Sequence, residues 1–78
     1  MNKEIDFGNH IKFLRKKLGM TQVQLAEKVG VSKGTVAMWE VNKRETSFEM
    51  LIKLSKLFDA SIDFLIRGYE FKEDFLYE

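Results

Sequence analysis

The chain has 78 residues and a net charge of +1, and its length supports one hydrophobic core and one domain. With 45% apolar residues, no proline, no cysteine and one histidine, the composition excludes a disordered chain, a disulfide framework, a thiol nucleophile and a zinc site. No apolar run is long enough to span a membrane, and the charged start of the chain is followed by no apolar region of the signal-peptide kind. We therefore expect a cytoplasmic, all-α protein without metal, cofactor or enzymatic activity.

Apolar spacing predicts a first helix over residues 7–18 and a second, of about eight residues, that ends at residue 29. Gly19 and Gly30 end these helices, and Gly30 is expected to adopt a positive φ. Thr21 and Gln24 form a capping box at the start of the second helix. The side chains expected to face the core are Phe7, Ile11, Leu14, Leu18, Leu25, Ala26 and Val29.

Ser32 is expected to cap a third helix over about residues 33–41, which Asn42 ends in a left-handed conformation. Val36 and Trp39 face inward at helical spacing. We therefore interpret Trp39 as a core residue rather than as a stacking residue for nucleic-acid bases. The outward arc of this helix holds Lys33, Gly34, Ala37 and Met38.

A fourth helix is expected to begin at Thr46 and Ser47, where Thr46 and Glu49 form a second possible capping box. Ser61 is expected to cap a short fifth helix that Gly68 ends. The side chains expected to face the core are Phe48, Leu51, Leu54 and either Leu57 or Phe58 from the fourth helix, and Ile62, Leu65 and Ile66 from the fifth.

Charge is distributed unevenly along these helices. Residues 10–44 hold eight basic and two acidic side chains, whereas residues 45–78 hold four basic and eight acidic ones. A domain with a basic half suits a polyanionic partner, because clustered charge sets the local field. A mixed charged surface with an accidental run is the plainer alternative. His10 is expected on the polar side of the first helix, without a partner for acid–base chemistry.

The second helix, the turn over residues 30–32 and the third helix form a tight angular pair. In this arrangement one helix lies across a DNA backbone while the next enters the major groove. Many small helical proteins contain such a corner, so the motif alone is a weak signal. With its flanking segments, however, the chain over residues 8–67 resembles the helix-turn-helix regulators typified by phage repressor and Cro proteins, the XRE family. The resemblance is carried by Ile11–Gln22, Gln24–Ser32, Thr35–Glu40, Ser47–Leu51 and Ser61–Leu65.

The resemblance implies a compact five-helix bundle of the lambda-repressor-like type over residues 1–68, with helices two and three as the helix-turn-helix. It implies a sequence-specific, bacterial or phage-encoded regulator at the nucleoid, most simply a repressor that binds a two-fold DNA operator as a homodimer. No small-molecule substrate is implied. The alternative is a protein-interaction module, such as an antitoxin or bridging factor with a protein partner. The sparse polar groups of the third helix and the aromatic tail favour this alternative, and the basic segment argues against it.

The resemblance also assigns roles to particular residues. Lys33, Gly34 and Met38 match positions that approach base edges, and Ala37 lies on the same arc and is assigned to the same base-reading set. Lys33 suits a guanine, and Ala37 and Met38 offer only apolar contact. Residues that match or flank phosphate-contacting positions are Gln22, Ser32, Thr35, Lys43 and Arg44. For Gln22 the plainer alternative is a solvated helix start, and for Ser32 it is a helix cap alone.

Arg15 and Glu40 match an ion pair that ties the first helix to the end of the third, and we interpret them as scaffold first and DNA contact second. The chain departs from the family at Asn42, where glycine is usual, and at Thr46, where proline is usual. Gly34 inside the third helix costs about 1 kcal/mol relative to alanine. Either the backbone approaches DNA at Gly34 or the helix is slightly loose there.

Residues 69–78 lie beyond the resemblance. They hold five large apolar side chains together with four acidic and one basic side chain. So many apolar groups are not expected to remain in water. This acidic aromatic tail is predicted either to pack back on helices one and five or to join a two-fold dimer contact.

Overall fold

The computed structural model describes residues 6–68, and residues 1–5 and 69–78 lie outside the described part of the chain. The prediction for the tail therefore concerns residues outside this range. The described residues form five helices and no strand: α1 (Phe7–Lys17), α2 (Gln22–Val29), α3 (Lys33–Glu40), α4 (Phe48–Phe58) and α5 (Ile62–Arg67). The predicted all-α fold with five helices is confirmed, with helix ends within about one residue of those expected.

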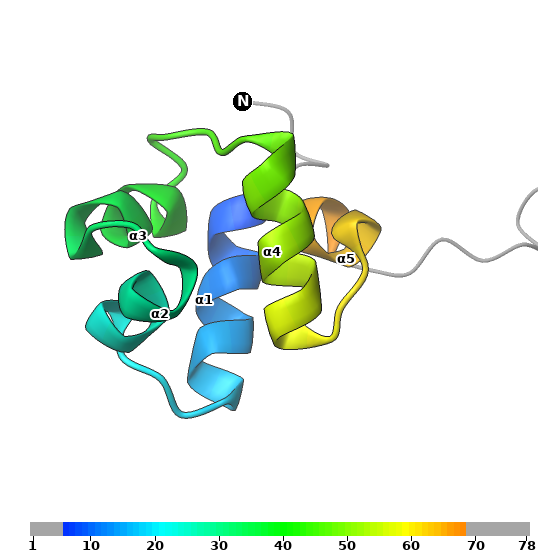
Figure 1. Cartoon of the computed structure of the whole chain (residues 1–78). Coiled ribbons are helices and arrows are strands. Elements are labelled where there is room, and N and C mark those ends of the chain that lie inside the picture. The colour runs from blue at the N-terminus through cyan, green and yellow to red at the C-terminus, as the bar shows by residue number, and fades with distance from the viewer. Residues whose placement is uncertain (1–5, 69–78) are drawn as a thin grey trace, which may run out of the picture.

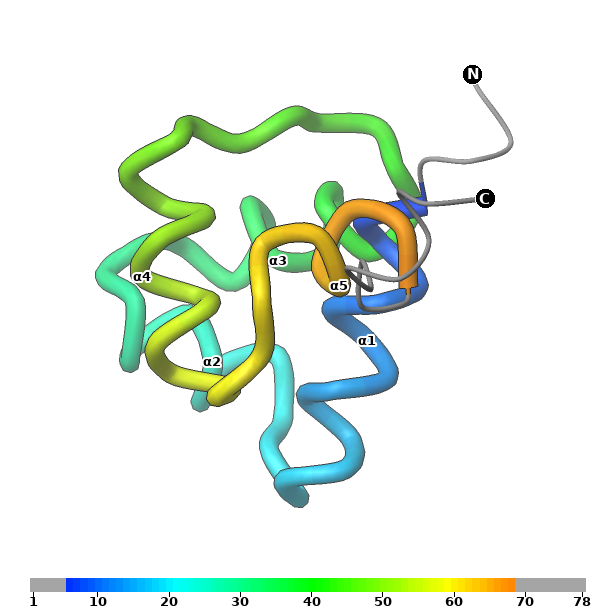
Figure 2. Tube along the Cα trace, turned by 90° about the vertical axis from the view of Figure 1, so that its right-hand side faces the viewer, coloured from blue at the N-terminus to red at the C-terminus, as the bar shows by residue number. Residues whose placement is uncertain are grey.

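α1 occupies the middle of the bundle, with α2 and α3 on one side and α4 and α5 on the other (Figure 1). It packs against α3 and α5, while α2 packs against α3 and α4, and α4 packs against α5. The segment between α3 and α4 crosses over the top of the molecule, which the tube in Figure 2 shows from the side. Among residues 6–68, no other helix covers the outer face of α3.

The core takes a fully buried side chain from each of the five helices, namely Ile11, Leu25, Val36, Leu54 and Leu65. Burying an aliphatic side chain of this size contributes about 1.5 to 3 kcal/mol. The ring of Trp39 is also buried and meets the ring of Phe7 edge to face, with centroids 6.0 Å apart. The prediction that Trp39 is a core residue is confirmed.

Hydroxyl side chains start four of the helices. The oxygens of Thr21, Ser32, Ser47 and Ser61 each accept a hydrogen bond from the backbone N–H three residues on. The predicted capping box of Thr21 and Gln24 is present. The prediction of a second capping box at Thr46 and Glu49 is wrong, because the N-cap of α4 is Ser47 rather than Thr46. Gly30 and Asn42 adopt the predicted left-handed conformation, with φ of 78° and 58°.

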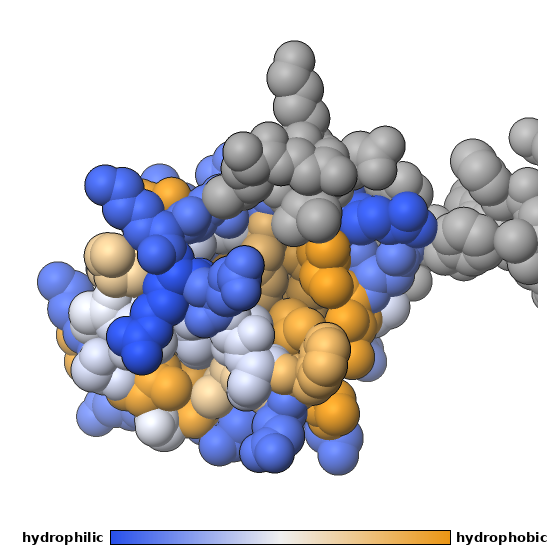
Figure 3. Space-filling model, turned by 90° about the horizontal axis from the view of Figure 1, so that it is seen from above, coloured by the Kyte–Doolittle hydropathy of each residue, from blue (hydrophilic) through white to orange (hydrophobic). Residues whose placement is uncertain are grey.

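Two side chains that were expected in the core lie at the surface. Phe48 is 86% exposed, and Ile62 is also exposed. Each is the first residue of its helix, where no other helix of the described chain covers it. Helical spacing gives the direction of a side chain, but not whether a partner reaches it. Figure 3, which views the molecule from above, shows apolar surface on the side of the molecule where α4 and α5 lie.

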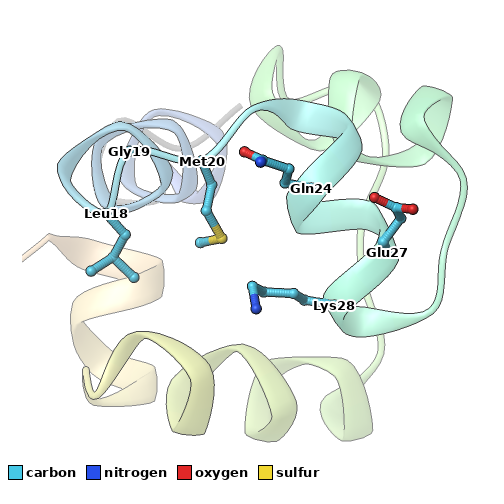
Figure 4. A pocket seen from close by; sticks show the side chains of 6 residues that line it. All are labelled: Leu18, Gly19, Met20, Gln24, Glu27 and Lys28. Atoms are coloured by element: carbon cyan, nitrogen blue, oxygen red, sulfur yellow. The ribbon is translucent and has the colours of Figure 1, made fainter.

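Leu18 was also expected in the core, yet its side chain is 54% exposed. α1 ends at Lys17, and Gly19 then turns the chain with φ of 71°. Leu18 therefore lies at the edge of an open hollow of about 590 Å³ between the end of α1 and α2, which Figure 4 shows from close by. The other side chains that line this hollow are Met20, Gln24, Glu27 and Lys28.

A junction that the sequence did not predict ties the start of α1 to the end of α3. Asp6 caps α1 by accepting from the N–H of Asn9. The Nδ2 of Asn42 donates to Oδ1 of Asp6 at 2.8 Å, and Oδ1 of Asn42 accepts from the N–H of Gly8 at 2.8 Å. Hydrogen bonds from Asn42 and Asn9 lower the pKa of Asp6 below its ordinary value of 3.8.

We expect Asp6→Asn to lower stability at pH 7 and to have little effect in acid. A carboxyl group whose pKa is depressed by folding stabilises the native state above its unfolded pKa, and this contribution is lost as the pH falls through the folded pKa. Urea unfolding of both proteins at pH 7 and below about pH 3 measures the difference. An equal difference at both pH values would assign the effect to hydrogen-bond geometry rather than to charge.

His10 is half-buried rather than on an open surface, because α5 packs over its side of α1. Its Nδ1 lies 3.1 Å from the carbonyl oxygen of Leu65, and its ring lies beside that of Phe64. His10 therefore lies in the contact between α1 and α5 rather than on an open polar side of α1. The observed contacts give His10 a packing role between α1 and α5.

Candidate nucleic-acid interface

α3 is anchored by one face and open on the other. Val36 and Trp39 are buried in the core, whereas Lys33 and Gly34 are exposed and Met38 is 40% exposed. Ala37 lies half-buried on the same outward side. The four predicted base-edge residues therefore form one arc of α3, which presents a single cation, two apolar side chains and bare backbone.

The corner between α2 and α3 is held by backbone and by one lysine. The N–H groups of Gly30 and Val31 both donate to the carbonyl oxygen of Ala26, at 2.9 and 3.0 Å. Lys53 of α4 donates from Nζ to the carbonyl oxygen of Val29 at 3.0 Å. A cation at a helix C-terminus is favourable because it meets the negative end of the helix dipole. These contacts fix the angle at which α3 projects.

Arg15 and Glu40 form a buried ion pair between α1 and the last residue of α3. Arg15 donates from Nε to Oε2 of Glu40 at 2.6 Å and from Nη2 to Oε1 at 2.9 Å. Its Nη1 donates to the carbonyl oxygen of Met20 at 2.8 Å. The side chains are 9% and 3% exposed, so the pair is part of the scaffold, as the sequence resemblance implies.

Gln22, the first residue of α2, joins this pair. Its Nε2 donates to Oε1 of Glu40 at 3.1 Å, which fixes a side chain predicted to meet a phosphate. Burial alone would raise the pKa of Glu40, but hydrogen bonds from Arg15 and Gln22 and the charges of Arg15 and Lys12 lower it below its ordinary value. The hydrogen bond that Arg15 donates to Glu40 likewise raises the pKa of Arg15. Both groups are therefore charged at neutral pH.

The remaining predicted phosphate contacts flank the two ends of α3. At its start, the hydroxyl groups of Ser32 and Thr35 lie 2.9 Å apart, and Ser32 also caps the helix. Beyond its end, Lys43 and Arg44 are exposed, and the N–H of Lys43 donates to the carbonyl oxygen of Met38 at 2.9 Å. Lys43 and Arg44 thus follow α3 closely, with the backbone of Lys43 bonded to that of Met38 in the outward arc.

The described residues contain neither a membrane-spanning helix nor a group of metal-binding side chains. Among residues 6–68, no helix is both long and apolar enough to cross a membrane. Within the same range, no group of three or more histidine, cysteine, aspartate or glutamate side chains is placed to hold a metal ion.

Similar proteins place this geometry among known regulators. The Repressor protein C2 of Salmonella phage P22 is 38% identical over 68 residues, which cover 87% of this chain and 31% of that repressor. Its crystal structure in complex with a synthetic operator has a TM-score of 0.76 and 38% identity, and the match covers 81% of this chain and 96% of the crystallised one. The biofilm master regulator SinR in complex with DNA has a TM-score of 0.69 and 37% identity, over 76% of this chain and 95% of that one.

The fold also occurs within an enzyme. Hydroxypropylphosphonic acid epoxidase from S. wedmorenis has a TM-score of 0.74 at 26% identity, and the match covers 83% of this chain but 36% of the epoxidase. Such a partial likeness shows a shared fold rather than a shared activity. The chain itself spans about half the length, or less, of several curated relatives that it matches.

A family model described as helix-turn-helix matches residues 11–65, which is most of the chain. The family resemblance predicted from the sequence is therefore confirmed, and the named repressors and regulators are not enzymes. The chain belongs to the helix-turn-helix family of transcriptional regulators, of the type found in phage repressors.

Proposed function

We propose that this protein is a transcriptional regulator that binds specific sequences in double-stranded DNA by placing α3 in the major groove. The observation that carries the proposal is the outward arc of α3, which no other helix within residues 6–68 covers, while its inner face is buried in the core. The relatives that are bound to an operator or to DNA in their crystal structures support the same function.

Within this proposal the residues divide into two roles. Lys33 donates to a guanine edge, and Ala37 and Met38 make apolar contacts, for which a thymine methyl is the natural partner. The phosphate contacts come from Gln22, Ser32, Thr35, Lys43 and Arg44. With one polar base contact, part of the specificity comes from DNA shape.

The proposed active form is a homodimer that binds a two-fold operator, most simply as a repressor in the cytoplasm. Phe48 and Ile52 lie one turn apart on α4 and are both exposed, and Ile62 of the adjoining α5 is exposed as well. A two-fold contact requires a self-complementary patch, and apolar side chains of this kind suit one. Dimers of this class bind half-sites about one helical turn of DNA apart.

Selection of bound sequences from a randomised duplex pool, at about 150 mM salt, tests the function. A two-fold motif preferred by roughly a thousandfold or more over random DNA is the expected result. Failure to enrich a motif, with only weak and salt-sensitive binding, would favour the alternative of a protein-interaction module.

We expect Lys33→Ala and Arg44→Ala to weaken binding in different ways. Loss of a base contact at Lys33 should cost about 1 to 3 kcal/mol at the selected site and relax the preference at one base pair. Loss of a phosphate contact at Arg44 should weaken all sequences alike and reduce the salt slope by about one. Titrations on specific and random duplexes at several salt concentrations distinguish the two. Equal losses on both duplexes for Lys33→Ala would contradict the base-contact role.

A further inference from the structure

A second hollow lies on the side of α1 that faces α4 and α5. It has a volume of about 190 Å³ and lies where α1, the end of α4 and α5 meet. Three aromatic rings line it, those of Phe13, Phe58 and Phe64, together with Lys17 and Asp59. Phe13 is 57% exposed, which leaves an aromatic ring on the open side of the hollow.

We propose that the segment of residues 69–78 docks in this hollow within the same molecule and covers Phe13 and Phe64. The segment holds the apolar side chains needed to fill the hollow, namely Tyr69, Phe71, Phe75, Leu76 and Tyr77. Aromatic pairs in offset or edge-to-face contact contribute about 0.5 to 1.5 kcal/mol beyond the area that they bury.

Residues 69–78 are long enough to extend from the end of α5 to this hollow. Gly68 ends α5 one turn beyond Phe64, and it lies against His10, since a side-chain carbon at Gly68 would be 2.5 Å from Nε2 of His10. Phe13 follows His10 by three residues on α1, which is a rise of about 4.5 Å. An extended chain of the same length as the segment spans roughly 33 Å, so several residues suffice to reach the hollow.

Charge also favours this occupant. The segment carries four acidic side chains and one basic side chain, and the exposed Lys17 of α1 lines the hollow. Asp59 also lines the hollow, so the acidic side chains of the segment are expected beside Lys17. Docking there would also keep the acidic segment away from the outward arc of α3, because α1 lies between them.

A spin label on the segment tests the proposal in the full chain. The protein has no cysteine, so Lys72→Cys provides a single attachment site and leaves every apolar and acidic side chain of the segment in place. We expect the label to cause loss of amide NMR intensity at Lys17 and Ala60, whereas Thr35 on α3 keeps its intensity. Uniformly retained intensity at the residues of the hollow would overturn the proposal.

Two controls make the assignment specific. Adding Phe71→Ser and Phe75→Ser to the labelled chain should restore the intensity at Lys17 and Ala60, and loss that persists in this variant would contradict docking through the aromatic rings. Isotope-labelled protein without the spin label, mixed with spin-labelled protein of natural isotope content, should keep its intensity. Loss in that mixture would mean that the segment of a second copy fills the hollow, which would overturn docking within one molecule.

Discussion

Glu40→Ala is expected to lower the free energy of unfolding by about 3 to 5 kcal/mol. The substitution leaves the buried guanidinium of Arg15 without the two hydrogen bonds that it donates to Glu40, at 2.6 and 2.9 Å. It also removes the acceptor of Gln22. A domain of this size has a total stability of roughly 4 to 12 kcal/mol, so the variant should be marginally folded. Urea unfolding followed by the fluorescence of the buried Trp39 measures the loss.

The double substitution Arg15→Met with Glu40→Leu is the matched control. Replacing a buried ion pair by apolar side chains of similar volume is often neutral or stabilising, because the cost of removing two charges from water disappears. We therefore expect the double variant to recover most of the stability that Glu40→Ala loses. If the double variant is as unstable as the single one, the pair contributes net stability and the argument from an uncompensated charge is wrong.

The double variant also separates stability from DNA binding. Gln22 is held by Glu40 in the present structure and loses this partner when leucine replaces the carboxylate. A folded double variant with weakened binding to all DNA sequences would indicate that Glu40 orients Gln22 toward a phosphate. Unchanged binding would restrict Glu40 to the scaffold.

The helices and most of the core follow from sequence patterns. Apolar spacing and hydroxyl caps predict α2 and α3 closely, because short-range hydrogen bonds such as that of Thr21 with Gln24 determine where a helix starts. The pairing of Arg15 with Glu40 came from the family resemblance. Residues 25 positions apart carry no local signal of contact.

What the sequence did not reveal depends on contacts between distant elements. Phe48 has the right spacing for the core, yet nothing in the described chain covers it. Asn42 was expected to replace a glycine for its backbone conformation alone, but its side chain also links Asp6 to Gly8. A sequence pattern gives the direction of a side chain within one helix, whereas such partners depend on how the helices pack.

We expect Gly8→Ala to be strongly destabilising, while Gly34→Ala stabilises the protein. Each glycine is the second residue of its helix, in α1 and α3. A side-chain carbon at Gly8 would collide with the carbonyl oxygen of Trp39 and lie 2.8 Å from that of Glu40. Both are backbone atoms at the end of α3, so α1 and α3 must move apart. We expect a loss of at least about 1 to 3 kcal/mol, the cost typical of overpacking.

Gly34 is the matched control, because the nearest atom to an added carbon there is Oγ of Ser32, at 3.8 Å. Alanine is favoured over glycine in a helix by up to about 1 kcal/mol, so Gly34→Ala should raise the midpoint of thermal unfolding. Binding of this stabilised variant to the selected duplex then decides between the two explanations for Gly34. Weakened binding means that the backbone of α3 approaches DNA at Gly34, since one methyl group cannot otherwise interfere, whereas equal or tighter binding means that the glycine only loosens the helix.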